Sequence, residues 1–357
     1  MTRIDHARRC FLAATGGTIL AGCIGGSGDD SSGSTADGEP DVGSVTLLLN
    51  WRMSGLHAPY VAARENGFYE DEGFQEVTIE SGDGSDFAAN QAGLENVEFA
   101  ITSSDQLLNV NSRGLSPRCV AVVMQRNPNV VFATRDGFGE LTEPAQLEGA
   151  TVGSGPGMVR QMTQAYLEHH DVLETVEYVD TGFDTVQQLL AGDIDAAGGV
   201  FGDVVDAEQQ GGTVDTLSID ETIPSYGHLV ATGAEFATTN ETTVRSFLRA
   251  TARGAVWASN NPDAAVDLLI EVQPELETVR ENQLDKWNRM RSEYMQSDSV
   301  AEHGWGWNEP SPWERTYDTL EAADVFENDV DPETVWTNDY LDDADEYIAD
   351  YAELVET

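Results

Sequence analysis

The dipeptide Asn50-Trp51 is the first place in this chain where residue type and position favour chemistry. It directly follows a short apolar run over residues 45–49, which predicts a buried strand with this pair at its carboxyl end. His57 follows, near the predicted start of a helix. An indole face stacks on flat rings, and an amide offers a donor and an acceptor to their edges. These residues predict a site for a flat heteroaromatic molecule; alternatively, Trp51 is a core residue and His57 packs or caps the helix start.

Other candidate residues follow predicted strands or begin predicted helices. Ser103-Ser104 lie between a strand at residues 99–102 and a helix at 105–112, where they either face a ligand or serve as a plain helix cap. The turn over residues 153–157 is rich in glycine but lacks the Gly-Lys-Ser/Thr ending of a phosphate-binding loop, so we expect it to expose backbone amides. The full set of candidate ligand residues is Asn50, Trp51, His57, Gly84, Ser85, Ser103, Ser104, Ser154, Gly155, Phe201, Asp203 and Tyr226.

Further candidates lie around residues 200 and 226. Phe201 would form an aromatic wall, and Asp203 would be an acidic partner for a ring amine. Tyr226 and His228 lie where the chain is expected to return between lobes, so they are either hinge or ligand residues. Three tryptophans, Trp305, Trp307 and Trp313, belong either to a closing loop or to the packed tail.

The elements that must position these residues alternate between strands and helices. Short apolar runs near residues 45, 77, 99, 120, 151, 176, 196 and 229 predict strands, and the stretches 58–65, 86–94, 105–112, 159–168 and 185–191 predict helices. This order predicts an α/β protein with mostly parallel strands. From residue 240 onward the spacing of apolar residues is helical only.

The length after residue 44 exceeds one ordinary core and favours two lobes. We expect a two-lobe periplasmic-binding-protein type II fold with a helical C-terminal tail. Lobe 1 would comprise residues 45–135 and 227–357, and lobe 2 residues 136–226. Ligands bind beyond the carboxyl ends of strands in open α/β sheets, so two facing sheets would enclose one cleft that hinge motion could close.

The first 23 residues predict export and lipid anchoring. Arg8-Arg9 precede an apolar run too short to span a bilayer, and Leu20-Ala21-Gly22-Cys23 resembles a lipoprotein cleavage site. Residues 1–22 would be a twin-arginine signal peptide, with a lipid on Cys23 and residues 23–44 as a flexible linker. An uncleaved N-terminal anchor is the alternative, and it also leaves the domain outside the cell.

The charge of the chain is extreme, with 64 acidic and 18 basic residues and a formal net charge of −46. The 40% hydrophobic content is ordinary for a globular protein, which argues against disorder. An acidic surface with a single lysine, Lys286, indicates adaptation to concentrated salt, where self-repulsion is screened. This charge makes nucleic acid an unsuitable partner.

No arrangement of residues predicts catalysis or metal binding. His169 and His170 are adjacent, so on a helix they point in different directions and cannot readily share a metal ion. The remaining cysteine, Cys119, lies in an apolar run and is expected to be a core thiol. We therefore expect no cofactor and no enzyme activity.

Several motifs in order resemble one family of transport proteins. They include Asn50-Trp51, Leu56-His57-Ala58-Pro59-Tyr60, residues 67–74 (GFYEDEGF), residues 82–85 (GDGS), residues 190–196 (LAGDIDA) and residues 336–341 (WTNDYL). This series resembles the ABC importer proteins that bind thiamine pyrimidine precursors, together with the related fungal-type pyrimidine synthases. The broader superfamily also contains sulfonate, taurine and nitrate binders.

The resemblance implies a haloarchaeal-type lipoprotein that captures a hydroxymethylpyrimidine-like molecule and delivers it to ABC permease and ATPase subunits. A sulfonate, taurine or nitrate ligand is the alternative, with Arg52, Arg126 and Arg160 near the expected site loops. The synthase relatives carry a cysteine cluster and a cofactor-bearing lysine; this chain lacks that cluster, and its one lysine lies in a late helix. An exported enzyme, or a surface sensor or adhesin, is a more distant alternative.

Overall fold

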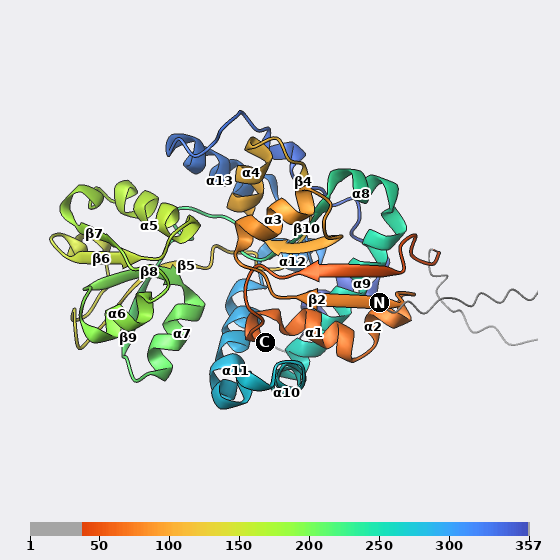
Figure 1. Cartoon of the computed structure of the whole chain (residues 1–357), viewed down its shortest axis with the longest axis horizontal. Coiled ribbons are helices and arrows are strands. Elements are labelled where there is room, and N and C mark those ends of the chain that lie inside the picture. The colour runs from red at the N-terminus through yellow and green to blue at the C-terminus, as the bar shows by residue number, and fades with distance from the viewer. Residues whose placement is uncertain (1–37, 356–357) are drawn as a thin grey trace, which may run out of the picture. The chain divides into compact units, whose positions relative to one another are not determined.

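The computed structural model describes residues 38–355, which contain two five-stranded mixed sheets (Figure 1). The first sheet has the order β2-β1-β3-β10-β4, and the second has the order β7-β6-β8-β5-β9. The strands are β1 (Ser44–Leu48), β2 (Glu76–Glu80), β3 (Phe99–Thr102), β4 (Pro117–Val122), β5 (Asn129–Thr134), β6 (Thr151–Ser154), β7 (Glu177–Asp180), β8 (Ala196–Val200), β9 (Val214–Ser218) and β10 (Leu229–Gly233).

Helices surround both sheets and make up most of the chain after β10. Those before β10 are α1 (Ala58–Glu65), α2 (Phe68–Asp71), α3 (Ser85–Gly93), α4 (Ser104–Ser112), α5 (Met158–His169), α6 (Thr185–Ala191) and α7 (Phe201–Gln209). Those after it are α8 (Ala234–Thr239), α9 (Glu241–Asn260), α10 (Pro262–Val272), α11 (Arg280–Arg289), α12 (Asp298–His303), α13 (Pro310–Ala322), α14 (Glu346–Ala349) and α15 (Tyr351–Leu354).

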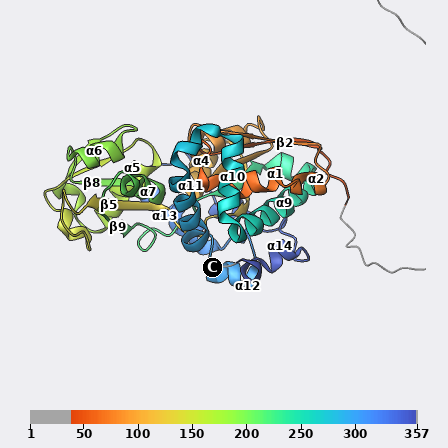
Figure 2. The same ribbon diagram turned by 90° about the horizontal axis from the view of Figure 1, so that it is seen from below.

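The first sheet is buried on both faces because its strand residues alternate between two helical layers. Leu47 and Leu49 pack into the core that α1 and α9 cover, whereas Leu48 packs against Ala88 and Ala92 of α3. Figure 2 shows α1, α9 and α10 gathered beside one another, in agreement with the core that they share. The first sheet is therefore a rigid platform for the residues that follow β1.

The second sheet follows the same rule. Val131 and Val152 face the core that includes Met162 and Tyr166 of α5. On the opposite face, Phe132 packs with side chains of α6 and α7. Each sheet therefore carries its own helical layers, as expected for an α/β protein.

The predicted α/β fold class is confirmed, and both sheets are mixed with four of their five strands running in the same direction, in agreement with the expected mostly parallel strands. In the first sheet, β10 runs antiparallel to both β3 and β4; in the second, β5 runs antiparallel to both β8 and β9. The predicted helices at residues 58–65 and 185–191 match α1 and α6. Two strands, β5 and β9, and the helix α7 were not predicted. The apolar residues of β9 and α7 are short runs interrupted by polar residues, whereas β5 contains a continuous apolar run at residues 130–133.

The division into lobes at residues 135/136 and 226/227 stays a prediction. β5 belongs to the second sheet, although the predicted boundary places residues 129–134 with the first. Because β5 and β9 both belong to the second sheet, we propose that the chain passes from the first sheet to the second between Val122 and Asn129. It would return to the first sheet between Ser218 and Leu229.

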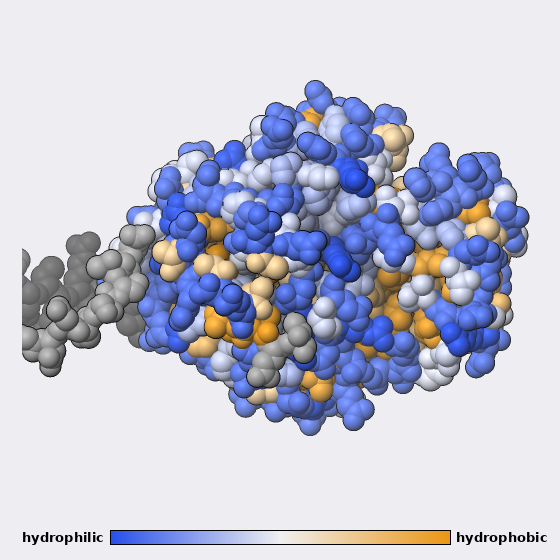
Figure 3. Space-filling view, turned by 180° about the vertical axis from the view of Figure 1, so that it is seen from behind, coloured by the Kyte–Doolittle hydropathy of each residue, from blue (hydrophilic) through white to orange (hydrophobic). Residues whose placement is uncertain are grey.

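The helical region after residue 240 agrees with the predicted tail. Trp305 and Trp313 are fully buried there, which favours tail packing for both. Within residues 38–355, every helix is too short or too polar to cross a bilayer. The face seen in Figure 3 is mostly hydrophilic, with hydrophobic residues in separate small areas. The predicted signal peptide, Cys23 and most of the linker lie outside the described residues.

Candidate functional site

The carboxyl edge of the first sheet holds Asn50 and Trp51 in place through their backbones. The Asn50 carbonyl accepts from the Gly84 N–H at 2.8 Å, and the Trp51 carbonyl accepts from the Gly82 N–H at 3.2 Å. A Cβ atom on Gly82 would lie 1.9 Å from the Leu49 carbonyl oxygen, so the loop after β2 can approach the end of β1 only with glycine there. The predicted motif at residues 82–85 is thus the support of Asn50-Trp51.

Trp51 faces an aromatic residue in the loop that follows β7 of the second sheet. Its ring lies 6.2 Å from that of Phe183, centroid to centroid, with 29° between the ring planes. Both are solvent-exposed, Trp51 by 45% and Phe183 by 81%. By contrast, the core pair Phe99 and Phe247 stacks directly at 3.8 Å. A planar ring between two stacked rings needs a separation of ~7 Å, because each stacking contact takes about 3.5 Å. The Trp51–Phe183 separation is about 1 Å less than this.

Phe183 reaches this position because two loops at the carboxyl edge of the second sheet approach closely. A Cβ atom on Gly155 would lie 2.9 Å from the Gly182 carbonyl oxygen. Ser154, at the end of β6, is buried and hydrogen-bonds to the hydroxyl of Tyr178 at 2.6 Å. Gly155 and Ser154 therefore support the loop that carries Phe183, which is the role that the structure gives to this predicted glycine-rich turn.

Two buried histidines hold the side chain of Asn50. His57 Nε2 lies 3.0 Å from Asn50 Oδ1, and His228 Nε2 lies 3.1 Å from Asn50 Nδ2. The two imidazole rings stack at 5.4 Å with 18° between their planes. Burial lowers the pKa of His228 to about 4, and burial together with the neighbouring His228 lowers the pKa of His57 well below its usual value. Both rings are therefore neutral at pH 7.

Ser104 and Tyr226 form a structural joint. Both are buried, the Tyr226 N–H donates to Ser104 Oγ at 3.0 Å, and the Ser104 N–H donates to the Tyr226 carbonyl at 3.2 Å. The Tyr226 hydroxyl accepts from the Glu309 N–H at 2.8 Å, and its ring packs edge-on against Trp313. These contacts give both residues an anchoring role at the return crossing, so we leave them out of the proposed ligand site.

Phe201 and Asp203 are also engaged within the protein. Phe201 is buried and stacks on Tyr294 at 4.2 Å, so it joins α7 to the π-helical turn Met290–Tyr294 rather than forming an open wall. Asp203 accepts from the Val200 N–H at 2.8 Å as a capping residue of α7, and burial raises the pKa of its carboxyl group. Neither side chain is therefore retained in the proposed site.

The remaining predicted residues begin helices at the edge of the first sheet. Gly84 precedes α3 with a φ of 127°, which favours glycine, and Ser85 is the first residue of that helix. Ser103 precedes α4 in extended conformation. All three are partly exposed and remain candidates.

Sequence reasoning missed Phe183 and left His228 undecided. Phe183 follows β7 by three residues, in a Gly-containing turn at a strand's carboxyl end, as Asn50-Trp51 follows β1. The same rule applied to that strand would have found it. His228 precedes β10, which runs antiparallel to β3, so its place at the same edge depends on a strand pairing that the sequence does not display.

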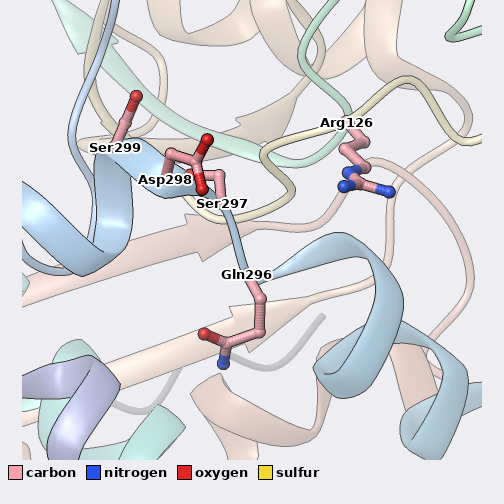
Figure 4. Close-up of a pocket in the computed structure, with 5 residues that line it drawn as sticks. All are labelled: Arg126, Gln296, Ser297, Asp298 and Ser299. Atoms are coloured by element: carbon pink, nitrogen blue, oxygen red, sulfur yellow. The ribbon is translucent and has the colours of Figure 1, made fainter.

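A separate pocket of about 560 Å³ lies where the segment after the π-helical turn Met290–Tyr294 meets the loop after β4. It is lined by Arg126, Gln296, Ser297, Asp298 and Ser299 (Figure 4). It shares no residue with the Trp51–Phe183 site, and its polar lining offers no aromatic face. Within residues 38–355, no cluster of three or more His, Cys, Asp or Glu side chains could hold a metal ion.

Comparison with known proteins places this edge in a family. Residues 55–265 match the NMT1/THI5 like family. The chain belongs to that family. The match begins at Gly55, beside His57, and ends beyond β10, so it includes both histidines and the Phe183 loop.

Curated relatives differ in their named functions. The riboflavin-binding protein RibY of Chloroflexus aurantiacus is 26% identical over 317 residues, covering 85% of this chain and 87% of the relative. The formylaminopyrimidine-binding protein of Halalkalibacterium halodurans is 24% identical over 321 residues, covering 85% and 92%. A 4-amino-5-hydroxymethyl-2-methylpyrimidine phosphate synthase of Legionella pneumophila is 24% identical over 246 residues, covering 66% and 75%.

Solved structures with the same fold include proteins named for the small anions that they bind. The nitrate-binding protein NrtA of Synechocystis has a TM-score of 0.64 at 12% identity, covering 90% of this chain and 92% of its own. The alkanesulfonate-binding protein SsuA of Xanthomonas axonopodis has a TM-score of 0.62 at 12% identity, covering 84% and 99%. The predicted periplasmic-binding-protein fold is thereby confirmed.

Proposed function

We propose that this protein is the extracytoplasmic substrate-binding subunit of an ABC importer and that it binds a planar heteroaromatic molecule. A thiamine pyrimidine precursor of the hydroxymethylpyrimidine type is the first candidate. The observation that carries this proposal is the exposed Trp51–Phe183 pair at 6.2 Å, one ring from each sheet edge.

Stacking between these two rings supports a flat ligand. Exposed aromatic side chains cost free energy in water, and a ligand ring inserted between them would bury one face of each side chain and both faces of its own ring. Asn50 lies beside this pair with polar groups for the ring edge. The named ligands of two relatives, riboflavin and a formylaminopyrimidine, are flat nitrogen heterocycles, which agrees with this chemistry.

The environment of Lys286 favours binding over the synthase reaction. Lys286 is the only lysine in the chain, and its Nζ lies 2.7 Å from Asp206 Oδ1, between α11 and α7. A lysine that forms a Schiff base must present a free amine to the cofactor, whereas the Lys286 amine is held by a carboxylate. We therefore propose a binding role without catalysis or cofactor.

The arginines give the anion alternative little support. Arg160 Nη2 pairs with Asp180 Oδ2 at 2.6 Å, so its charge is already compensated. Arg126 lines the separate pocket, and Arg52 is exposed beside the aromatic pair. A sulfonate or nitrate site needs positive charge or free N–H groups that converge on one point.

Location and partners are part of the proposal. The Arg8-Arg9 pair and the Cys23 segment support export and lipid anchoring to the outer face of the membrane. ABC permease and ATPase subunits would be the partners, with the lipid as the sole membrane attachment and no nucleic acid. The acidic composition supports work in high salt.

Calorimetry in high salt tests the ligand. We expect 4-amino-5-hydroxymethyl-2-methylpyrimidine to bind with a micromolar or lower Kd, and riboflavin, taurine, an alkanesulfonate and nitrate complete the panel. Trp51→Ala and Phe183→Ala should each weaken binding by about 1–3 kcal/mol, with little change in the free energy of unfolding, because both rings are exposed.

The matched control is Phe87→Ala, which removes another exposed ring, 41% accessible, from α3. It should leave both binding and stability nearly unchanged. Heat with nitrate or the sulfonates alone would contradict the heterocycle while leaving the importer role in place. Sustained conversion of the pyrimidine would contradict the binding role itself.

A further inference from the structure

The hydrogen bonds around Asn50 form a chain with one permitted direction. It starts at the backbone N–H of Ser54, which lies 3.1 Å from His57 Nδ1. A backbone N–H can only donate, so His57 Nδ1 must be the unprotonated acceptor and Nε2 carries the proton. His57 Nε2–H then donates to Asn50 Oδ1 at 3.0 Å, which leaves Asn50 Nδ2 to donate to His228 Nε2 at 3.1 Å.

The reverse direction fails at its first step. If the Asn50 amide were turned over, its N–H would face His57 Nε2, and the proton of His57 would have to move to Nδ1. That proton would then face the Ser54 N–H, donor against donor, inside a buried site. The Ser54 N–H thus sets the tautomer of His57 at one end of the hydrogen-bond chain, and His228 Nε2 must accept at the other end for both ends of the Asn50 amide to be held.

We propose that His228 is a positioning residue for the ligand: its Nε2 accepts from Asn50 and completes the chain that holds this amide in one of its two orientations. The inference rests on the proposed function and adds to it the polar complement of the ligand. His228 is the Nδ1–H tautomer, and His57 is the Nε2–H tautomer.

The Asn50 side-chain amide keeps two hydrogen-bonding positions for a ligand. Asn50 Oδ1 uses one acceptor position on His57, and Nδ2 uses one hydrogen on His228. Among the contacts of the described chain, this half-buried amide side chain has no further protein partner. One N–H donor and one oxygen acceptor position are left in fixed places.

This pair selects a class of ligand. A heterocycle with an acceptor nitrogen or carbonyl and a donor N–H on its rim satisfies both positions, as an aminopyrimidine or a flavin ring does. Nitrate and the sulfonate group offer acceptors only, so they would leave the Asn50 oxygen without a donor as it is desolvated. The polar complement and the aromatic pair thus point to the same kind of molecule through separate observations.

Histidine tautomers in the ligand-free full-length protein provide the first test. In protein labelled with ¹⁵N-histidine, long-range ¹H–¹⁵N correlation spectra at pH 7 distinguish protonated from unprotonated ring nitrogens. We expect protonated Nδ1 in His228 and protonated Nε2 in His57. A protonated Nε2 in His228, or a charged ring in either residue, would overturn the inference.

Asn50→Asp tests the direction of the hydrogen bonds that link His57, residue 50 and His228. The substituted carboxylate only accepts, so His228 should move its proton to Nε2 while the backbone contact of His57 persists. His170 is the internal control, since its Nε2 faces Thr222 Oγ1 at 3.2 Å and not Asn50. An unchanged His228 tautomer in Asn50→Asp would show that Asn50 does not set it.

A third test measures ligand binding. It compares each heterocycle with an analogue in which methyl groups replace the N–H donor. The probes are 4-amino-5-hydroxymethyl-2-methylpyrimidine against its 4-dimethylamino counterpart, and riboflavin against 3-methylriboflavin. Blocking the donor should weaken binding of the preferred ring about 10-fold or more. This discrimination should disappear in His228→Leu and persist in His228→Gln, whose amide oxygen can accept in place of Nε2. Equal discrimination in wild type and His228→Leu would overturn the positioning role.

Failure of the proposed function and failure of the inference about His228 give different experimental results. If none of the four probes binds, the proposed heterocycle function is wrong and the ligand half of the inference falls with it. The tautomer spectra need no ligand, so they still decide whether His228 positions Asn50. If a probe binds but His228 has the other tautomer, the function stands and the inference fails.

Discussion

His57 and His228 link the site to pH through their buried neutral rings. Burial lowers the pKa of His228 from 6.5 to about 4, and the pKa of His57 is lowered in the same direction. Between these values the unfolded chain binds protons that the folded protein does not, so stability must fall as pH decreases. Above about pH 6.5 both states are neutral at these residues, and the full stability is present.

We therefore predict that the free energy of unfolding falls between pH 6.5 and 4 by on the order of 3 kcal/mol on account of His228 alone. Chemical denaturation across this range, in wild type and His228→Gln, measures the contribution as the difference between the two slopes. Carboxyl groups with raised pKa, such as Asp345, act in the opposite direction but are common to both proteins. His170→Gln is the control, since that ring is only partly buried and should change the slope less than His228 does. Parallel slopes for wild type and His228→Gln would contradict the neutral buried ring.

At the scale of elements, the site depends on how closely loops can approach strand ends. The loop after β2 touches the end of β1 at Gly82, and the turn after β6 touches the turn after β7 at Gly155. Both contacts are to backbone oxygens, which cannot rotate away as side chains can. These two glycines therefore set the positions of Trp51 and Phe183.

Gly82→Ala should destabilise the protein by about 1–3 kcal/mol and weaken ligand binding, because its methyl group must displace the loop from the Leu49 carbonyl. Thermal unfolding and calorimetry measure the two effects. Gly202→Ala in α7 is the matched control: its methyl group would lie 3.7 Å or more from its neighbours, an ordinary contact. A Gly82→Ala protein with normal stability and affinity would show that the loop is not held as described.

At the scale of the whole molecule, the charge balance decides the solvent that the protein needs. Even if each of the 18 basic residues neutralised one acidic residue, 46 acidic residues would remain. The ion pairs that exist, such as Arg249 with Glu72 and Lys286 with Asp206, are local and cannot offset that excess. We propose that screening by concentrated salt offsets it.

We predict cooperative unfolding in molar salt and loss of structure in dilute buffer. Circular dichroism during dialysis from molar to millimolar salt measures this directly. Recovery of the signal on returning the salt would show that repulsion, not aggregation, removed the structure. A spectrum unchanged in dilute buffer would contradict adaptation to high salt.

The sequence by itself determined most of the elements and half of the proposed site. Apolar runs and helical spacing predicted most strands, the α/β class and the helical tail, because burial imposes those periods locally. Asn50, Trp51 and His57 could be predicted for the same reason: they follow one strand and precede one helix. β9 and α7 could not, because their short and interrupted apolar runs give too weak a local signal, whereas the continuous apolar run of β5 at residues 130–133 carries that signal and was missed.

Only the tertiary structure decided which candidates share one place. Phe183 meets Trp51 from the other sheet, 132 positions along the chain, and His228 reaches Asn50 through the antiparallel pairing of β10 with β3. The same folding buried Ser104, Phe201 and Tyr226 among protein partners, although their types and positions suited a ligand. The sequence shows residue types and the local periodicity of apolar residues. The order of strands and the approach of loops to one another depend on contacts between distant segments. Those contacts decide which polar groups are left for a ligand.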